Sequence, residues 1–396
     1  MSKFGRLKAP GLLSSPLIYI HSMSPSRLAV KIIFFLNGFV HANYFSRLPR
    51  IQDQFGIDNG VVGLVLLSSS IGALLAMPFT GWLIIRNGSR RISIFSCYFY
   101  CSLIPFIPWM PHLWALIILF FLLGISSGML DVAMNSQAVM VEKQLEKPIM
   151  TSFHALFSIG MMLGAVSGSL FTKLGAGIFV HFAVVSGISL VTVFIARYYL
   201  VHDKPVQAPV EGPAFRLPNA AMISIGVIAF CSMLGEGAMA DWSTNYMENI
   251  AQADPALAPI GLSAFALAMT IGRLFGDSAR VKYGDRNLMV ACGLIAAVGL
   301  GCAILFIHPF AVIGGLFIVG IGLSAIVPIA YSVAGHTKDL PPGVGLAMVT
   351  TVGYSGFLFG PPIIGFIANW QSLRIALGLV MILFLLMTFL SFKRKA

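Results

Sequence analysis

The sequence is poor in charge. Only 10% of its 396 residues are Asp, Glu, Lys or Arg, whereas soluble globular proteins carry about 25%. Hydrophobic residues make up 58% of the chain. This composition excludes an ordinary soluble globular protein and is typical of a chain that lies within a lipid bilayer.

The sequence also lacks the motifs of several enzyme classes. It contains no GxxxxGK[S/T] loop that would bind the phosphates of ATP, and no HExxH zinc motif. Its five cysteines lie in apolar stretches, and the close pair Cys97 and Cys101 has no nearby histidine or second cysteine pair. We therefore expect neither an enzyme nor an ATP-driven pump, and no metal ion or cofactor.

Twelve apolar segments are long enough to cross the ~30 Å hydrocarbon core of a bilayer as helices. They are predicted at residues 28–50, 59–84, 91–110, 112–141, 148–172, 177–200, 219–247, 257–280, 287–307, 309–333, 344–369 and 371–391. The sequence therefore predicts an all-α integral membrane protein with twelve transmembrane helices.

Lysine and arginine are distributed unevenly between the predicted loops. If both ends of the chain lie in the cytoplasm, twenty of the 25 basic residues fall on the inner side and four on the outer side. Cytoplasmic loops of membrane proteins carry this excess of positive charge. The bias predicts cytoplasmic termini, and it accounts for the net charge of +11 without a nucleic acid partner.

A polar stretch with four prolines, HDKPVQAPVEGPAFRLP, divides the chain into two similar parts. At an offset of 196 residues, Gly124 corresponds to Gly320 and Gly160 to Gly356. Duplicated bundles of this kind are typical of secondary transporters, whose site lies between the two halves. We predict a cytoplasmic tail at 1–27, six-helix bundles at 28–201 and 219–391 related by pseudo-two-fold symmetry, a linker at 202–218 and a basic tail at 392–396.

The turn after the second predicted helix resembles the loop signature of the major facilitator superfamily. Residues 81–91, GWLIIRNGSRR, match the signature at six positions, with Arg86, Arg90 and Arg91 as the basic residues. Ile85 stands where the family has an aspartate that helps to hold the outward-open state. The resemblance implies two six-helix bundles and a latch that is weaker or built differently.

The fourth predicted helix resembles that of the fucose-permease-like branch of this family. Residues 130–135, LDVAMN, match its pattern of Leu, acid, any, Ala, any, Asn. The acid of that branch couples transport to protons, so the resemblance assigns this role to Asp131. His154 takes the place of a glutamine of the fifth helix, and Ala42 stands where the branch has a carboxylate that it uses with sugar.

Asp131 is also a candidate site without any resemblance. Gly124, Gly128, Asp131 and Asn135 share one face of the predicted helix. The glycines allow a neighbouring helix to approach, and the acid must face protein or a wet cavity because contact with lipid is costly. Such a carboxyl group can carry a proton, and the alternative is a structural partner for an arginine or a helix end.

Other polar residues in the predicted spans are candidates for a central site. Glu236, between Gly235 and Gly237, is predicted to partner Asp131 across the halves in a locally unwound helix. Arg273 is expected to pair with Glu236 or Asp277 in preference to contacting solute. The predicted substrate-binding residues are Asn37, His41, Asn135, His154, Asn245, Tyr354 and Phe357, with packing as the alternative for His154 and the aromatic pair.

A further group of residues is predicted near the outer ends of the helices. Arg47 is predicted to close an outer gate, whereas Arg50 is expected to be solvated. Asp241 is interpreted as a gate or an anchor. Interface anchors are expected at Trp109, Trp114, Trp242 and Trp370.

These observations favour a proton-coupled secondary active transporter that works by alternating access. Its expected partners are protons, the lipid bilayer and a small polar solute such as a sugar-like molecule, and we expect a monomer in a bacterial inner membrane. An exporter of drugs or metabolites is an alternative that the aromatic and methionine-rich composition also suits. The alternative of another class is a non-transporting membrane sensor or lipid-handling protein.

Overall fold

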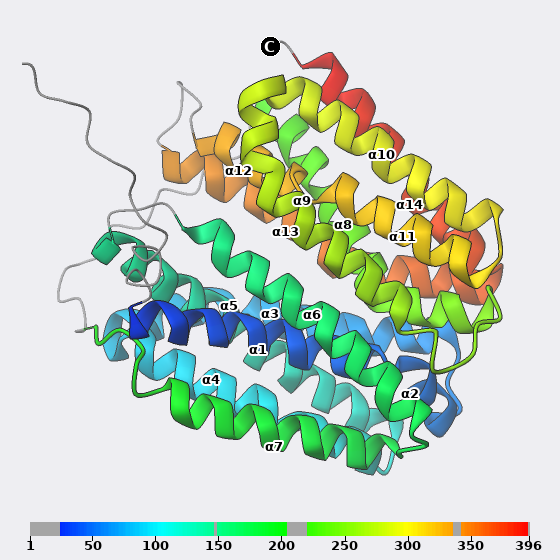
Figure 1. The fold of residues 1–396 in the computed structure, drawn as a ribbon, viewed down its shortest axis with the longest axis horizontal. Helices are drawn as coiled ribbons and strands as arrows, with labels where there is room; N and C mark the ends of the chain where they lie inside the picture. Colours follow the sequence, from blue (N-terminus) through cyan, green and yellow to red (C-terminus); the bar gives the residue numbers. More distant parts are fainter. Residues whose placement is uncertain (1–23, 146–148, 204–219, 336–341, 395–396) are drawn as a thin grey trace, which may run out of the picture.

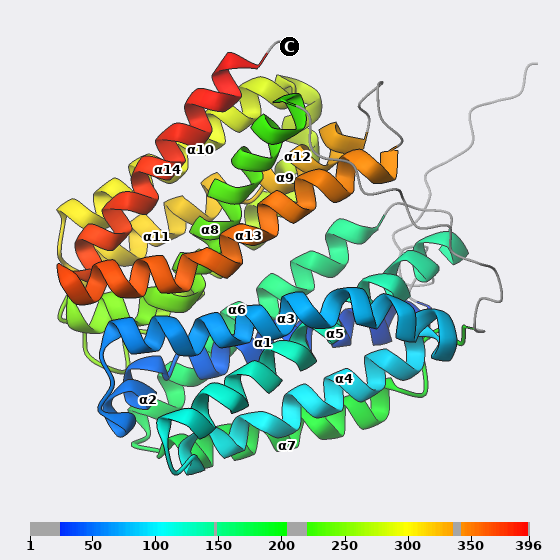
Figure 2. The same cartoon turned by 180° about the vertical axis from the view of Figure 1, so that it is seen from behind.

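The protein is a bundle of long helices that run back and forth (Figures 1 and 2). The computed structural model describes residues 24–145, 149–203, 220–335 and 342–394, which form helices and connecting turns without a strand. Within these residues, eleven helical stretches are long and apolar enough to cross a membrane, and the apolar segment Ile260–Gly276 is a shorter twelfth. This confirms the predicted all-α fold.

Two groups of helices make up the bundle. The N-terminal half contains α1 (Pro25–Phe45), α2 (Leu48–Phe55), α3 (Asn59–Asn87), α4 (Ser89–Leu103), the 3-10 helix η2 (Ile104–Trp109), α5 (Leu113–Leu145), α6 (Met150–Lys173) and α7 (Ile178–Ala196). The C-terminal half contains α8 (Ala220–Asn249), α9 (Ile260–Tyr283), α10 (Asp285–Leu305), α11 (Pro309–Leu323), α12 (Ile326–Gly335), α13 (Pro342–Trp370) and α14 (Leu373–Lys393).

The first span is shorter than predicted. It was expected to reach residue 50, but α1 ends at Phe45 and a separate short helix, α2, follows with Pro49 in its first turn. Proline is well tolerated there because the first amides of a helix have no acceptor within it. The break turns Arg47 and Arg50 in directions that one continuous helix would not allow.

The tenth span is broken just before Val327–Pro328. The helix α11 ends at Leu323 and α12 begins at Ile326, because proline cannot donate the backbone hydrogen bond of a continuous helix. Most of the predicted linker, 202–218, lies outside the described residues, so the predicted division into regions stays a prediction.

Side-chain caps begin several of the helices. The Asp58 carboxylate accepts a hydrogen bond from the Val61 amide at the start of α3, and the Ser372 hydroxyl accepts one from the Ile375 amide at the start of α14. Each cap satisfies an amide that has no partner within its helix. Asp and Ser at these positions therefore mark where two spans start.

The two halves meet at one end of the bundle and diverge at the other (Figures 1 and 2). We call the end at which α1 begins and α14 ends the terminal end, and the end near α2 the opposite end. Across the seam, α3 packs against α13 and α6 packs against α9. The same four helices therefore join the halves and border the space between them.

Close backbone packing joins α3 and α13 at the opposite end. A Cβ atom built on Gly365 would lie 2.6 Å from the Asn59 carbonyl oxygen and 2.9 Å from the Gly63 Cα atom. Both neighbours are backbone atoms, which cannot move away as a flexible side chain can. Glycine at position 365 is therefore required for the halves to meet here.

The substitution Gly365→Ala should open the opposite end, because overpacking of this kind costs about 1–3 kcal/mol. Gln54 and Gln371 are exposed and lie one in each half. Pulsed electron paramagnetic resonance should show a longer distance between spin labels attached at these two positions. Gly378→Ala is the matched control, because a Cβ there meets no atom within 4 Å. An unchanged distance distribution in Gly365→Ala would contradict this role of the packing.

Candidate functional site in the cavity between the halves

A cavity of about 540 Å³ lies between the two halves, within the range of roughly 300–1,000 Å³ that is typical of small-molecule sites. It extends from Phe45 at the end of α1 to Met150 and Thr151 in the first turn of α6. The cavity therefore reaches from the closed opposite end toward the terminal end. The predicted site residues that line it are Asn37, His41, Asp131, His154, Glu236, Asp241, Arg273, Tyr354 and Phe357.

Asp131 lies midway along α5 and faces this cavity. Its Oδ1 atom accepts a hydrogen bond from Asn135 Nδ2 at 3.3 Å, and its Oδ2 atom accepts one from the Tyr354 hydroxyl at 3.5 Å. In the described part of the chain no basic side chain forms an ion pair with it. Its partners are therefore neutral, and one of them comes from the other half.

The glycines of α5 bring α3 close to Asp131. A Cβ atom on Gly124 would lie 1.8 Å from the Ser69 carbonyl oxygen, and one on Gly128 would lie 2.7 Å from the backbone of Ala73. The close helix approach predicted from these glycines is confirmed. It holds α5 firmly against its neighbour, so that the Asp131 side chain projects into the cavity from a rigid support.

Glu236 pairs with Arg273 and not with Asp131. Arg273 Nη2 lies 3.0 Å from Glu236 Oε1, and Arg273 Nη1 donates to the Ser158 hydroxyl at 2.6 Å. The ion pair expected for Arg273 is therefore present within the C-terminal half, and the hydrogen bond to Ser158 reaches from α9 to α6 in the other half. The expected unwinding is absent, because α8 continues through Gly235 and Gly237.

Three polar side chains of the N-terminal half face the cavity with different partners. Asn37 is directed at the Met134 sulfur at 3.7 Å, and the His41 ring contacts the Tyr44 hydroxyl at 3.1 Å. The His154 ring packs edge-on against Phe34, with 5.3 Å between centroids. Asn37 and His154 thus have polar atoms that a solute in the cavity can engage.

Two predicted substrate-binding residues do not line the cavity. Asn135 donates to the backbone carbonyl of Asp131 as well as to its carboxylate. Asn245 donates across the halves to the Gln52 side-chain oxygen at 2.9 Å. The first residue therefore orients Asp131, and the second joins α8 to α2.

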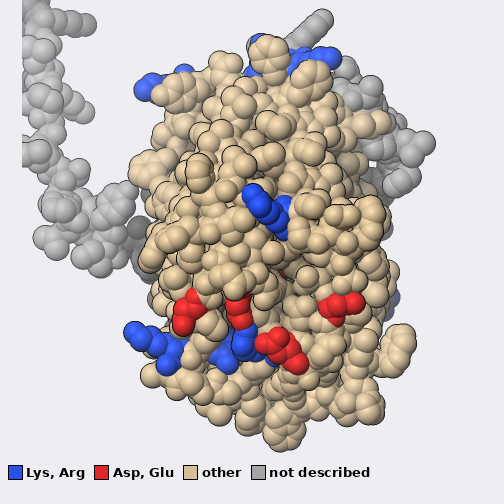
Figure 3. All heavy atoms as spheres, turned by 90° about the vertical axis from the view of Figure 1, so that its right-hand side faces the viewer, with Lys and Arg blue, Asp and Glu red and all other residues tan. Residues whose placement is uncertain are grey.

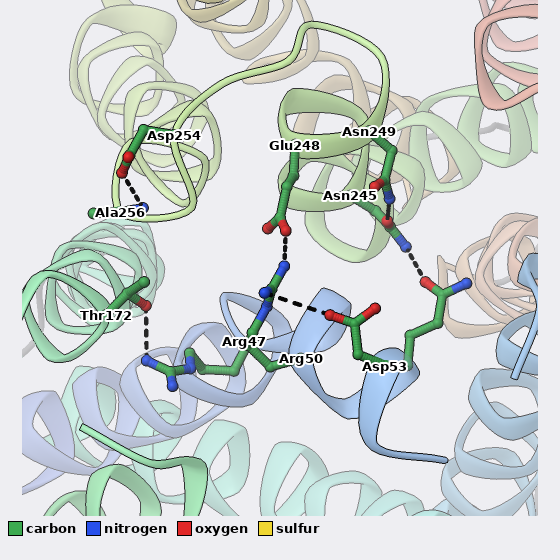
Figure 4. Close-up of polar contacts among 10 residues, drawn as sticks. Arg47, Arg50, Asp53, Thr172, Asn245, Glu248, Asn249, Asp254 and Ala256 are labelled. Carbon is green, nitrogen blue, oxygen red and sulfur yellow. Dashed lines mark hydrogen bonds and ion pairs between the residues drawn. The ribbon is translucent and has the colours of Figure 1, made fainter. Parts of the chain in front are cut away.

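The two arginines of the opposite end, Arg47 and Arg50, have different partners from those predicted (Figure 4). Arg47 donates to the Thr172 hydroxyl at 2.7 Å and to the Ala176 carbonyl at 2.9 Å, both in its own half. Arg50, expected to be solvated, forms the ion pair with Glu248 of α8. The break between α1 and α2 accounts for these partners, because it turns Arg50 toward the other half and leaves Arg47 within its own half.

Acidic side chains gather near the seam on the face of the opposite end (Figure 3). Besides Glu248, Asp53 lies 3.4 Å from Arg50.

Trp242, predicted as an interface anchor, is instead fully buried. It lies in the stretch of α8 that packs inside the protein, since α8 borders both the cavity and the other half.

The basic turn at the terminal end is held without the aspartate of the family signature. The Asp203 carboxylate, just beyond α7, accepts hydrogen bonds from the Ser89 and Arg90 amides. Arg90 also donates to the Arg197 carbonyl at 2.8 Å, and Arg86 stacks on Trp82. Arg91 is exposed. An acid from a distant position thus caps α4.

Several residues of the site were missed by sequence reasoning. Glu248 follows Asp241 by seven positions and Asn245 by three, so the three share one face of α8, a spacing that predicts a polar face toward the seam. The partner of Asn245, Gln52, carried no such signal, and neither did Ser158. Polar residues of short loops and serines within spans are too common to single out.

Comparison with known proteins agrees with this architecture. The sequence profile of the Major Facilitator Superfamily matches residues 31–233 and 225–396. The chain belongs to the Major Facilitator Superfamily. It is 34% identical to an uncharacterised MFS-type transporter of Yersinia pestis, over 91% of this chain and 93% of that protein. It is 32% identical to the membrane protein MosC of Rhizobium meliloti, over 91% and 89%.

Solved structures share the fold at low sequence identity. A variant of the nucleoside transporter NupG matches with a TM-score of 0.74 and 13% identity, over 91% of this chain and 98% of that one. A bacterial homologue of the human lysosomal transporter Spinster, in an inward-facing and occupied conformation, matches with a TM-score of 0.71 and 14% identity, over 94% and 97%. These matches show the Major Facilitator Superfamily fold alone.

Reversing one charge of the ion pair between Arg50 and Glu248 should open the opposite end of the bundle. Arg50→Glu places like charges beside Glu248 and Asp53, which removes a contact worth ~1 kcal/mol or less and adds repulsion. The population that is open at this end should rise several-fold, as measured with labels on Gln54 and Gln371.

The double variant Arg50→Glu, Glu248→Arg restores opposite charges and is the matched control. In this variant the population that is open at the opposite end should fall most of the way back to its value in the unmodified protein. If the single variant leaves the distances unchanged, or the double variant is as open as the single one, the ion pair does not hold this end closed.

Proposed function

We propose that this protein is a proton-coupled secondary active transporter of a small polar solute, working by alternating access. The observation that carries the proposal is the position of Asp131. Its carboxyl group faces a cavity shared by both halves, and one of its hydrogen-bond donors, Tyr354, belongs to the other half. Intramembrane acids in such positions mark ion or substrate pathways.

The orientation follows from the positions of the basic side chains. Arg86 and Arg90 lie at the terminal end, with Lys282 and Lys393 at the last turns of α9 and α14. Since loops on the cytoplasmic side are rich in Lys and Arg, we assign the terminal end to the cytoplasm of a bacterial inner membrane. The cavity then reaches toward the cytoplasm while the outer end is closed.

The contact between Asp131 and Tyr354 provides a way to couple protons to movement. A charged carboxylate accepts a stronger hydrogen bond than a protonated carboxyl group does. Loss or gain of the proton therefore changes the free energy of a contact that spans the halves. A difference of this kind between two conformations is what coupling requires.

The lining suits a solute that forms several hydrogen bonds. Asn37 and His154 offer polar atoms from one half, while Tyr354 and Phe357 supply aromatic faces from the other. Small-molecule sites usually combine an apolar wall with a few placed polar groups. The resemblance of residues 130–135 to the fucose-permease-like pattern also supports a sugar-like solute, although Ala42 argues against fucose itself.

Asp131→Asn should retain exchange of solute across the membrane while losing uphill accumulation. The amide preserves size and hydrogen bonding but carries no titrating proton. Accumulation under an imposed pH gradient and exchange without a gradient, both in proteoliposomes, measure the two activities. The direction in which the unmodified protein accumulates solute under the gradient also distinguishes import from export.

Asp254→Asn is the matched control, because Asp254 is an exposed acid whose carboxylate accepts a hydrogen bond from the Ala256 amide outside the cavity. This variant should accumulate solute normally. Full accumulation by Asp131→Asn would exclude Asp131 as the coupling group.

His154→Ala should weaken solute binding more than it alters coupling, because the imidazole faces the cavity, whereas the Asp131 carboxylate is hydrogen-bonded to Asn135 and Tyr354. Loss of one neutral hydrogen bond costs about 0.5–1.5 kcal/mol, which is roughly two- to tenfold in affinity. The Michaelis constant and the ratio of protons to solute measure the two effects. His112→Ala, at an exposed loop position, is the control, and an unchanged affinity in His154→Ala would assign that histidine to packing.

A further inference from the structure

We infer that Asp241 binds a positively charged amine of the transported solute, so that the substrate is an amine-bearing polar molecule. The inference rests on the proposed transport function and names the class of its substrate. It assigns to Asp241 a task separate from that of Asp131. Four observations support it: the burial of Asp241, its lack of a partner, the side chains around it, and the length of the cavity.

Asp241 is buried and has no partner among the residues that the structure describes. Its side chain on α8 lines the cavity and is only 9% exposed. Across the described residues, no hydrogen bond or ion pair reaches its carboxylate. A buried carboxylate without a donor is strongly unfavourable, and a donor on a solute in the cavity would remove that cost.

The neighbouring arginines are engaged elsewhere. Arg273 is paired with Glu236 and bonded to Ser158. Arg50 is paired with Glu248. Arg47 is bonded to acceptors of its own half. None of these hydrogen bonds or ion pairs involves Asp241, although the buried Nε atom of Arg47 has no acceptor among the described residues.

Aromatic rings surround this end of the cavity. Tyr44 lies within electrostatic range of Asp241, and its ring packs against Phe45 with 4.6 Å between centroids. The His41 ring lies 4.5 Å from Phe45. A carboxylate beside aromatic faces is the environment in which an ammonium group gains both an ion pair and a cation–π interaction.

An inorganic cation fits this place less well. Calcium and magnesium ions require several oxygen ligands at once, whereas the lining residues His41, Phe45 and Ala240 carry no side-chain oxygen. Among the described residues there is no group of three His, Cys, Asp or Glu side chains that could hold a metal ion. One carboxylate with aromatic neighbours favours a single organic ammonium group.

The cavity has room for the polar remainder of the solute. Asn37 and His41 are four residues apart on α1, so they share a face and lie about 6 Å apart along the helix. With the amine at Asp241 near His41, hydroxyl groups of the same molecule reach the level of Asn37 and Asp131. The solute then contacts both halves at once, as alternating access requires.

Matched pairs of probes test the inference without a proton gradient. Purified protein is titrated with glucosamine and glucose, galactosamine and galactose, and mannosamine and mannose, and the shift in thermal unfolding is recorded. At least one amine should stabilise the protein, with an affinity about tenfold or more above that of its hydroxyl counterpart, as expected for one charge-assisted hydrogen bond.

Three variants complete the test. Asp241→Asn should lose the preference for the amine, and Asp241→Glu should keep part of it, which shows that charge and not folding is responsible. Asp254→Asn, with its exposed acid outside the cavity, should behave as the unmodified protein does. Unfolding midpoints of the ligand-free variants report whether each one folds.

The inference is overturned if no amine of the set stabilises the protein, if the hydroxyl partners bind equally well, or if Asp241→Asn keeps the preference. Asp131→Asn should retain amine binding in this assay. If Asp131→Asn binds the amine and also still transports solute uphill, the coupling role of Asp131 is wrong and the amine site stands. If coupling depends on Asp131 but amines and hydroxyl compounds bind alike, only the amine site fails.

Discussion

The cost of placing charge in hydrocarbon governs this structure. Near the middle of the described spans, the charged side chains Asp131, Glu236, Asp241 and Arg273 all line one cavity between the halves. Facing lipid would cost each of them several kcal/mol, so each needs a surface where protein, water or solute replaces the lipid. Two bundles that enclose a shared space supply that surface, and these four side chains converge on it.

The contacts that join the halves are individually weak. They include a hydrogen bond from Ser70 to the Phe357 carbonyl, the contact between Tyr354 and Asp131, and the partly exposed ion pair between Arg50 and Glu248. Neutral hydrogen bonds and partly exposed ion pairs contribute roughly 1 kcal/mol each. A seam built from such contacts closes by their sum and opens when a few of them change, which suits two conformations of similar free energy.

Local patterns predicted much of the fold. Hydropathy over about 20 residues predicted the spans, because each helix must satisfy its own backbone in lipid. The helical repeat placed Asp131 on the face with Gly124 and Gly128. The need of an arginine within a span for a carboxylate predicted that Arg273 pairs with Glu236 or Asp277, and it pairs with Glu236. These features depend on a single helix or on a shortage of alternatives.

The contacts between distant elements were not predictable in the same way. One residue turns a helix by about 100°, so the break after Phe45 decided that Arg50 and not Arg47 meets the other half. Tyr354 was expected to form a wall for solute, yet its hydroxyl reaches Asp131. Such pairings depend on how far the halves are tilted, and no pattern within one span encodes that angle.

The two unpaired acids of the cavity differ in a way that matters for transport. Asp131 has donors from the protein itself, so it keeps hydrogen bonds whether or not it carries a proton. No donor from the described residues reaches Asp241, so its free energy depends on what occupies the cavity. A symporter must bind an ion and a solute separately and still link them, and linkage needs a conformation that both ligands favour. On the proposed mechanism, one acid on each half meets this need, because the halves must come together before both are satisfied.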